Sequence, residues 1–337
     1  MTKRPFPSPA RRRHLLQHGA LLAAAALAGT ALPAFAQSSA PSSRPIKLVV
    51  PFAPGTSTDI VSRAVGDELG KLLGQVVIVE NRAGAGGTIA TAAVAAAEPD
   101  GQTLVMGTVG THAINGALYR KITYNALKDF APVAYIGATP TLLVVSAASP
   151  VTTLAQLRAE MAKPGGVTYA SAGNGTSGHL AGALLEARLG GQAVHVPYKE
   201  GGQALTEVIA GQPLFMFYHP AAVLQHIQSG KLRGLGVSGA KRSAAAPDLP
   251  TLQEQGVADF DLVAWFMLYA PAATPQPVLA RLREASARAL ANPDLKRRLA
   301  AQGVESRPMT PAEMTEFGTR EAAKWAEAVK TSGAQID

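Results

Sequence analysis

Cysteine is absent from the 337 residues of the chain, and aromatic and charged residues are few, at 5% and 16%. Without cysteine the protein has no disulfide, no thiolate nucleophile and no cysteine-ligated zinc or iron–sulfur site. The scarcity of aromatic side chains leaves little for the base-stacking surfaces of single-stranded nucleic-acid binders. No H-E-x-x-H motif or close group of histidines and carboxylates indicates a metal site. We therefore expect neither a metal nor another cofactor.

Acidic residues are missing from the first 36 positions, which carry Lys3, Arg4 and three arginines at 11–13. The formal charge of +8 comes from 31 basic and 23 acidic residues, and without these five cations it falls to +3. The positive charge is therefore mostly a property of the N-terminus, which argues against nucleic acid as a partner. A hydrophobic content of 47% is enough for a sizeable core, and the length predicts about two domains.

Residues 1–36 have the three parts of an export signal. The arginines at 11–13 form the positive region, residues 15–32 form an apolar stretch, and Ala34-Phe35-Ala36 is a small-x-small cleavage site. Cleavage after Ala36 would release a periplasmic chain that begins at Gln37. The run Arg-Arg-His-Leu-Leu at 12–16 also fits a twin-arginine signal. The alternative is an uncleaved anchor, although the stretch contains two glycines and falls short of roughly 20 apolar residues.

Residues 37–44 have the composition of a linker, and the chain beyond them alternates between strand and helix patterns. Short apolar runs predict strands at 46–52, 76–79, 103–106, 135–146 (two strands separated at Pro140), 167–171, 194–197, 214–217, 235–237 and 265–271. Periodic apolar positions predict helices at 59–73, 88–97, 153–161, 179–189, 204–210, 221–227, 277–290 and 311–329. Such alternation predicts parallel strands in an α/β fold. We expect two α/β lobes, residues 45–140 with 260–337 and residues 141–259.

Two loops share one design. Residues 54–59 (Pro-Gly-Thr-Ser-Thr-Asp) and 173–178 (Gly-Asn-Gly-Thr-Ser-Gly) each lie between a predicted strand and a predicted helix. Small residues, hydroxyls and the free N–H groups of a helix N-terminus favour an anion by up to about 1–2 kcal/mol. The alternative is ordinary N-capping, by Thr58 or Asp59 in one loop and by Ser177 in the other. Because each predicted lobe carries one loop, we expect a ligand between the lobes.

Other chemistry is less well supported. The loop 173–178 also fits the G-x-G-x-x-G dinucleotide fingerprint, but the nearest downstream acid, Glu200, lies beyond the usual spacing. No G-x-S-x-G nucleophile elbow occurs, and Ser177 and His179 are too close in sequence to face each other.

Single polar and aromatic residues allow two interpretations each. His195 in an apolar strand fits a buried core histidine, and His112 fits either a cleft wall or a loop contact with the backbone. Tyr218 and His219 follow a predicted strand, where cleft-lining side chains often occur, although a solvated loop is the alternative. Trp265 fits core or hinge packing, with ligand contact as the alternative.

Many short motifs resemble the Bug family, the substrate-binding receptors of tripartite tricarboxylate transporters. The resemblance spans nearly all of the chain after residue 45. It rests on the segments 50–55 (VPFAPG) with Thr58-Asp59, 80–88 (ENRAGAGGT), 99–101 (PDG), 110–115 (GTHAIN), 128–133 (KDFAPV), 169–171 (YAS), 179–180 (HL), 196–199 (VPYK), 229–233 (SGKLR), 239–243 (GAKRS) and 264–266 (AWF).

The resemblance implies a two-lobed, hinged periplasmic-binding-protein fold of the Venus flytrap type, with a ligand carboxylate between the lobes. The implied ligand residues in the first lobe are Phe52, Gly55, Thr56, Ser57 and Asp59. Those in the second lobe are Asn174, Gly175, Thr176 and Ser177. Thr108, Thr111 and Tyr198 would line the walls.

The chain departs from the family pattern at two places. Thr56 replaces the usual second glycine, and Tyr218-His219 replaces an Asp-Asn pair. The loss of an acid favours a larger or aromatic acid over an amino acid, whose ammonium group needs a carboxylate. We therefore add Tyr218 and His219 to the predicted ligand residues.

The leading prediction is a monomeric, non-enzymatic receptor that captures a small carboxylate and delivers it to a membrane permease. The alternatives are a receptor of the same fold that presents its ligand to a signalling partner, and, less well supported, an exported enzyme.

Overall fold

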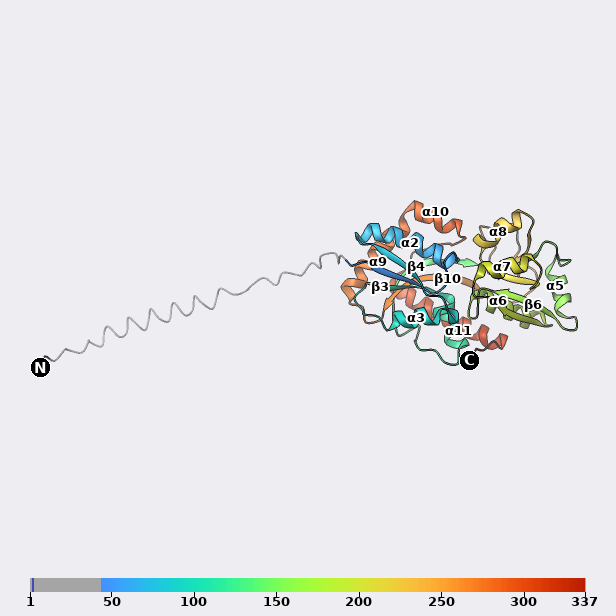
Figure 1. Ribbon diagram of the computed structural model, residues 1–337, viewed down its shortest axis with the longest axis horizontal. Coiled ribbons are helices and arrows are strands. Elements are labelled where there is room, and N and C mark those ends of the chain that lie inside the picture. The colour runs from blue at the N-terminus through green and yellow to red at the C-terminus, as the bar shows by residue number, and fades with distance from the viewer. Residues whose placement is uncertain (1, 3–43, 337) are drawn as a thin grey trace. The chain divides into compact units, whose positions relative to one another are not determined.

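A computed structural model describes residue 2 and residues 44–336 (Figure 1). The predicted export signal, its cleavage site and most of the linker lie outside the described residues. The first sheet has the strand order β2-β1-β3-β10-β4. Its strands are β1 Ile46–Val50, β2 Val77–Asn81, β3 Thr103–Thr108, β4 Phe130–Pro140 and β10 Val263–Pro271. Around it lie α2 Ser57–Leu73, η1 Ala85–Gly87, α3 Thr88–Ala95, η2 Gly110–Ile114, α4 Asn115–Leu118, α9 Gln276–Ala291, α10 Pro293–Ala301 and α11 Pro311–Ser332.

The second sheet repeats the plan of the first, with the order β7-β6-β8-β5-β9. Its strands are β5 Leu142–Ser146, β6 Val167–Ser171, β7 Ala193–Pro197, β8 Phe215–Tyr218 and β9 Leu232–Val237. Its helices are α5 Leu154–Met161, α6 Ser177–Leu189, α7 Gly201–Ile209 and α8 Pro220–Gln228. The two sheets with their helices confirm the two-lobed α/β fold.

Parallel pairing was predicted throughout, and this prediction is wrong for two strands. β1 runs parallel to β2 and β3, and β6 runs parallel to β7 and β8. β10, however, is antiparallel to β3 and β4, and β5 is antiparallel to β8 and β9. Each enters its sheet from the other lobe instead of through a helical crossover, so no crossover imposes the parallel direction.

The chain passes from the first sheet to the second at Thr141, between β4 and β5, and returns before β10. In Figure 1 both ends of the colour scale lie in the first lobe, and green and yellow occupy the second. The helix α11 packs on η2, α4 and β4 and also on α6 of the second lobe. The lobe boundaries 45–140 with 260–337 and 141–259 stay a prediction, which the change of sheet at Thr141 supports.

The first sheet is covered on both faces, as the alternation of its side chains requires. Leu48 is fully buried with Val61 of α2 and Leu279 of α9 on one face. The next residue, Val49, belongs to the cluster that holds Trp325 of α11 on the other face. Helices therefore cover both faces of the sheet, and a ligand can reach it only at the ends of the strands.

Several helix boundaries differ from the prediction, and two differences affect the site. α2 begins at Ser57 instead of Asp59, and α6 at Ser177 instead of His179, because Thr56 and Thr176 are the N-caps. The predicted caps Thr58, Asp59 and Ser177 are thus residues of the first helical turn. The helical segment 110–118 and α10 were not predicted. Within the described part of the chain, no helix has the length and apolar character of a membrane span.

Candidate ligand-binding cleft

A narrow cavity of about 60 Å³ lies where the strand ends of the two lobes meet. The lining residues from the first lobe are Phe52, Thr56, Ser57, Thr58, Thr108, Val109 and Gly110. Those from the second lobe are Ala172, Thr176, Ser177, Gly178, Phe217, Tyr218 and His219. β10 adds Ala264, Trp265 and Phe266. No lysine, arginine, aspartate or glutamate is among them, so an anion here has no formal countercharge from a lining side chain.

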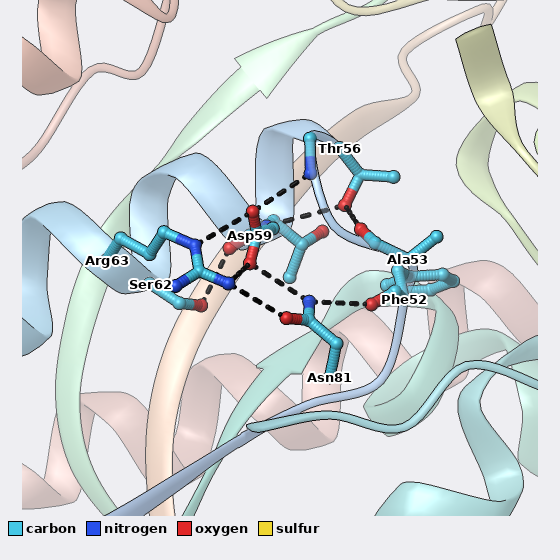
Figure 2. Close-up of polar contacts among 9 residues, drawn as sticks. Phe52, Ala53, Thr56, Asp59, Ser62, Arg63 and Asn81 are labelled. Atoms are coloured by element: carbon cyan, nitrogen blue, oxygen red, sulfur yellow. Dashed lines mark hydrogen bonds and ion pairs between the residues drawn. The ribbon is translucent and has the colours of Figure 1, made fainter. Parts of the chain in front are cut away.

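The first loop is tied to the sheet by the carboxylate of Asp59, which is 3% exposed (Figure 2). This carboxylate accepts hydrogen bonds from the Gly55 N–H at 2.9 Å, from Asn81 Nδ2 at 2.9 Å and from Arg63 Nε at 3.1 Å. Asn81 Nδ2 also donates to the Phe52 carbonyl at 3.0 Å. Asp59 was predicted to bind the ligand, but its carboxylate is occupied by this network and does not line the cavity.

The same contacts determine how Asp59 titrates. Burial raises the pKa of Asp59, but the hydrogen bonds from Arg63, Gly55 and Asn81, together with the Arg63 charge, outweigh it and lower the pKa below 3.8. The ionised carboxylate of Asp59 therefore stabilises the folded protein fully above pH 3.8, its ordinary pKa. This stabilisation is lost as the pH falls through the lowered pKa of the folded state.

We expect Asp59→Asn to lower the free energy of unfolding by about 1–3 kcal/mol, because three donors lose a charged acceptor. Urea denaturation at pH 7 measures this. Asp67→Asn is the matched control on the same helix, since Asp67 is half exposed and pairs with Lys71 and Arg298 at the surface. Equal losses for both variants would contradict the assigned role of Asp59.

The second loop repeats the first, residue by residue. Gly55-Thr56-Ser57 and Gly175-Thr176-Ser177 each start a helix, and both glycines have positive φ, at 80° and 73°. Each threonine hydroxyl donates to the carbonyl three residues earlier at 2.8 Å. Each glycine N–H donates to the side chain four residues later, Asp59 Oδ2 in the first loop and His179 Nδ1 at 3.2 Å in the second. The structure thus presents two equivalent helix N-termini to one cavity.

Two stacked histidines support the second loop from behind. The rings of His179 and His195 lie 4.0 Å apart, and His195 Nε2 lies 2.7 Å from Ser171 Oγ. Burial lowers the pKa of His179 to about 4. Burial, with His179 nearby, lowers that of His195 to about 3. Both rings are neutral at pH 7, which lets His179 Nδ1 accept from Gly175. His195 was predicted to be a core histidine; it is half-buried on the edge strand β7, with its ring nitrogen next to Ser171 and its ring packed on His179.

The turn after β3 forms a third part of the cavity wall, through Thr108, Val109 and Gly110. Thr108 N–H donates to Thr111 Oγ1 at 3.0 Å, and Thr111 Oγ1 lies 2.8 Å from His112 Nδ1. Thr111 is fully buried in these contacts and does not line the cavity, whereas Thr108 does. Here the backbones of the two lobes come close, since a Cβ on Gly110 would lie 2.7 Å from the Gly175 carbonyl oxygen.

The remaining wall is aromatic. Phe266 pairs with Thr108 across the sheet, and Trp265 donates from Nε1 to Glu321 at 2.9 Å. Tyr218 lines the cavity, but its hydroxyl lies against Gly201 at the start of α7. His219 Nδ1 is buried without a hydrogen-bond partner in the described chain, and burial lowers the pKa of His219 to about 4.

Eight of the fourteen predicted ligand residues line the cavity: Phe52, Thr56, Ser57, Thr108, Thr176, Ser177, Tyr218 and His219. The other six are not among its lining residues: Gly55, Asp59, Thr111, Asn174, Gly175 and Tyr198. Contact with a ligand stays a prediction for all of them. The lining residues that were not predicted are Thr58, Val109, Gly110, Ala172, Gly178, Phe217, Ala264 and Phe266, and Trp265 had ligand contact only as its alternative.

Two α/β lobes that meet at a cavity lined by helix N-termini define a two-lobed solute-binding protein. The chain belongs to the tripartite tricarboxylate transporter family receptors, whose family model matches residues 61–334. The resemblance to the Bug family is thereby confirmed.

Named relatives agree with this assignment. BugT of Bordetella pertussis is 35% identical over 313 residues, which cover 92% of this chain and 95% of BugT. Among solved structures, R. palustris Rpa4515 with adipate has a TM-score of 0.82 and 32% identity, covering 88% of this chain and 99% of that one. MatC (Rpa3494) from Rhodopseudomonas palustris with bound malate has a TM-score of 0.79 and 34% identity, covering 85% and 99%.

Proposed function

We propose that this receptor binds a small organic carboxylate between its lobes in the periplasm and delivers it to a membrane permease. The observation that carries the proposal is the pair of equivalent Gly-Thr-Ser helix N-termini facing one cavity without a charged lining side chain. An anion there is stabilised by backbone N–H groups and helix dipoles. Two similar proteins solved with adipate and malate support a carboxylate as the anion.

Binding then has a simple physical basis. Thr56 and Thr176 are engaged in capping, so Ser57 and Ser177, one residue further into each helix, are the hydroxyls that we assign to the carboxylate. Phe52, Phe217 and Trp265 cover the apolar part of the ligand. Closure of the lobes excludes water, which strengthens hydrogen bonds to the charged group.

The far end of the ligand meets neutral groups. His219 Nδ1 lacks a partner in the described chain, and the Tyr218 hydroxyl lies against Gly201. No lining carboxylate is available to an ammonium group, which disfavours amino acids. We therefore propose a larger or aromatic acid, with His219 as the polar contact. This acid enters when the lobes separate, since the cavity between them holds only about 60 Å³.

A non-enzymatic role is part of the proposal. The cavity contains hydroxyls of serine and threonine, and the one lining histidine, His219, has no hydrogen bond to them. Within residues 44–336 no group of metal-ligating side chains occurs either. A receptor that presents its ligand to a signalling partner has the same fold, and pull-down of a membrane partner with and without ligand distinguishes the two.

The direct test is native mass spectrometry of the purified protein before and after unfolding and refolding, followed by calorimetry with mono-, di- and aromatic carboxylates. We expect a copurified acid that is lost on refolding and one class of acid that binds again. A protein without copurified acid that binds no member of the panel would overturn the proposal.

Closure itself can be tested at Gly110. We expect Gly110→Ala to weaken binding at least tenfold, because the new Cβ would lie 2.7 Å from the Gly175 carbonyl oxygen of the other lobe. The same contact is present in the described structure without a ligand, so melting curves of the ligand-free variant are needed to show that it is folded. Gly116→Ala is the matched control, since a Cβ there meets nothing within 4 Å. Calorimetry with the best acid of the panel gives the affinities, and wild-type affinity in Gly110→Ala would contradict closure at this contact.

A further inference from the structure

A second and much larger cavity, about 770 Å³, lies in the first lobe away from the cleft. It is formed by β4, α9, α10 and the segment 304–309, and it shares no lining residue with the cleft. Its volume falls in the range of roughly 300–1,000 Å³ that is typical of small-molecule sites. The proposed function does not use this cavity.

The walls of this groove are mostly apolar. α9 faces it with Ala287, Leu290 and Ala291, spaced so that they share one side of the helix. α10 adds Leu299, and the segment that follows it and the start of α11 add Met309 and Met314. Small alanine side chains and flexible methionines in the lining suit an apolar ligand.

The charged residues of the groove form no ion pairs within residues 44–336, although the Arg307 guanidinium lies over the Tyr135 ring, 5.7 Å from its centre. They are Arg283, Lys296 and Arg307 together with Glu284 and Glu305. The guanidinium of Arg283 is half-buried and donates to the Pro132 carbonyl at 3.1 and 2.9 Å, which leaves its positive charge without a carboxylate. Burial lowers the pKa of Arg283, so a bound anion would offset the cost of burying this charge.

We propose that the groove is a second binding site, for an amphipathic monoanion with a long apolar tail. The tail lies along the alanine face of α9, and the anionic head lies near Arg283 with Lys296 and Arg307 around it. A monoanion matches the groove better than a dicarboxylate, because the three basic and two acidic residues of the groove sum to a charge of +1. A long apolar tail, and not the carboxylate itself, distinguishes the ligand proposed for the groove from that proposed for the cleft.

Decanoate is the probe, with decanol as the uncharged molecule of equal chain length, both below micelle concentration. By calorimetry we expect one decanoate per chain and at least tenfold weaker binding of decanol. Ala287→Trp fills the groove and should weaken decanoate at least tenfold. Ala280→Trp, on an exposed part of the same helix outside the groove, should bind as wild type does. Arg283→Gln should remove most of the difference between decanoate and decanol.

A cleft variant separates this site from the first. Ser177→Asp changes only the cleft, so its affinity for decanoate should equal that of the wild type. The decanoate experiment therefore tests the groove even if the cleft does not bind a carboxylate. Decanoate binding that persists in Ala287→Trp, disappears in Ser177→Asp or is matched by decanol would overturn the proposal. Melting temperatures of the variants show that each is folded, and the decanol comparison in the wild type tests the charge without any substitution.

Discussion

Ser177→Asp is expected to lower affinity for the bound carboxylate at least a hundredfold without lowering the melting temperature. Ser177 is the first residue of α6 and lines the cavity. An aspartate there would place a negative charge where the carboxylate is proposed to bind, and two like charges about 4 Å apart repel by about 4 kcal/mol at an effective dielectric constant of about 20. Each 1.4 kcal/mol or so is tenfold in affinity. The helix itself gains from an acidic residue in its first turn.

The control and the mirror variant make this test specific. Ser177→Asn keeps the size without the charge and should stay within about tenfold of the wild type. Ser57→Asp makes the same change at the equivalent position of the first lobe. Losses in both aspartate variants would place the anion between the two helix N-termini. A loss in only one would assign the anion to that loop, and wild-type affinity in both would contradict the anion site.

The sequence predicted the loops of this site better than the residues in them. Small and hydroxylated residues between a strand and a helix are enough to locate an anion-binding turn. The direction of each side chain is not local information, however. Asp59 faces away from the cavity because Asn81, from the next strand, and Arg63, one helical turn later, both donate to it. No spacing within the loop itself indicates these partners.

Phe266 was not predicted at the cleft, and Trp265 was predicted there only as an alternative, for a related reason. Trp265 and Phe266 lie at the cleft because β10 runs antiparallel to β3, which brings the start of β10 beside Thr108 at the end of β3. The pattern of strands alternating with helices predicted parallel pairing, which would place the start of this strand at the opposite edge of the sheet. Had the strands at the two lobe crossings been treated separately, their direction and these residues could have been predicted.

Between pH 7 and pH 5, proton uptake by His112 and His179 in the unfolded chain is expected to destabilise the protein by about 4 kcal/mol, which corresponds to a melting temperature roughly 10 °C lower, and His195 and His219, whose pKa values burial also lowers, add to this loss. His112 and His179 are 2% and 6% exposed, and burial lowers the pKa of His112 to about 3 and that of His179 to about 4. In the unfolded chain both titrate near 6.5. Between these values only the unfolded state takes up the protons, so stability falls as the pH falls, by about 2 kcal/mol for each histidine at pH 5.

The surroundings of the two rings explain why they stay neutral. His112 stacks on Tyr269 at 4.1 Å and meets the edge of Phe130 at 4.8 Å, with Nδ1 next to Thr111 and Nε2 without a partner in the described chain. His179 stacks on His195 and accepts from Gly175. A proton on either ring would create a buried charge with no carboxylate to pair with it.

His179→Asn separates this effect from general acid sensitivity, because an asparagine oxygen can replace Nδ1 as the acceptor of the Gly175 N–H. We expect its stability to depend on pH less steeply than that of the wild type, by about 1.4 kcal/mol per pH unit between pH 6 and 5. Urea denaturation across pH 5–7, repeated in high salt, gives both slopes. Added salt should leave them nearly unchanged, since burial and not a surface ion pair sets these pKa values. Equal unfolding free energies at pH 7 and pH 5 would mean that the two histidines are not buried in neutral form, and Gly175 would then lack the support that holds the second anion-binding loop.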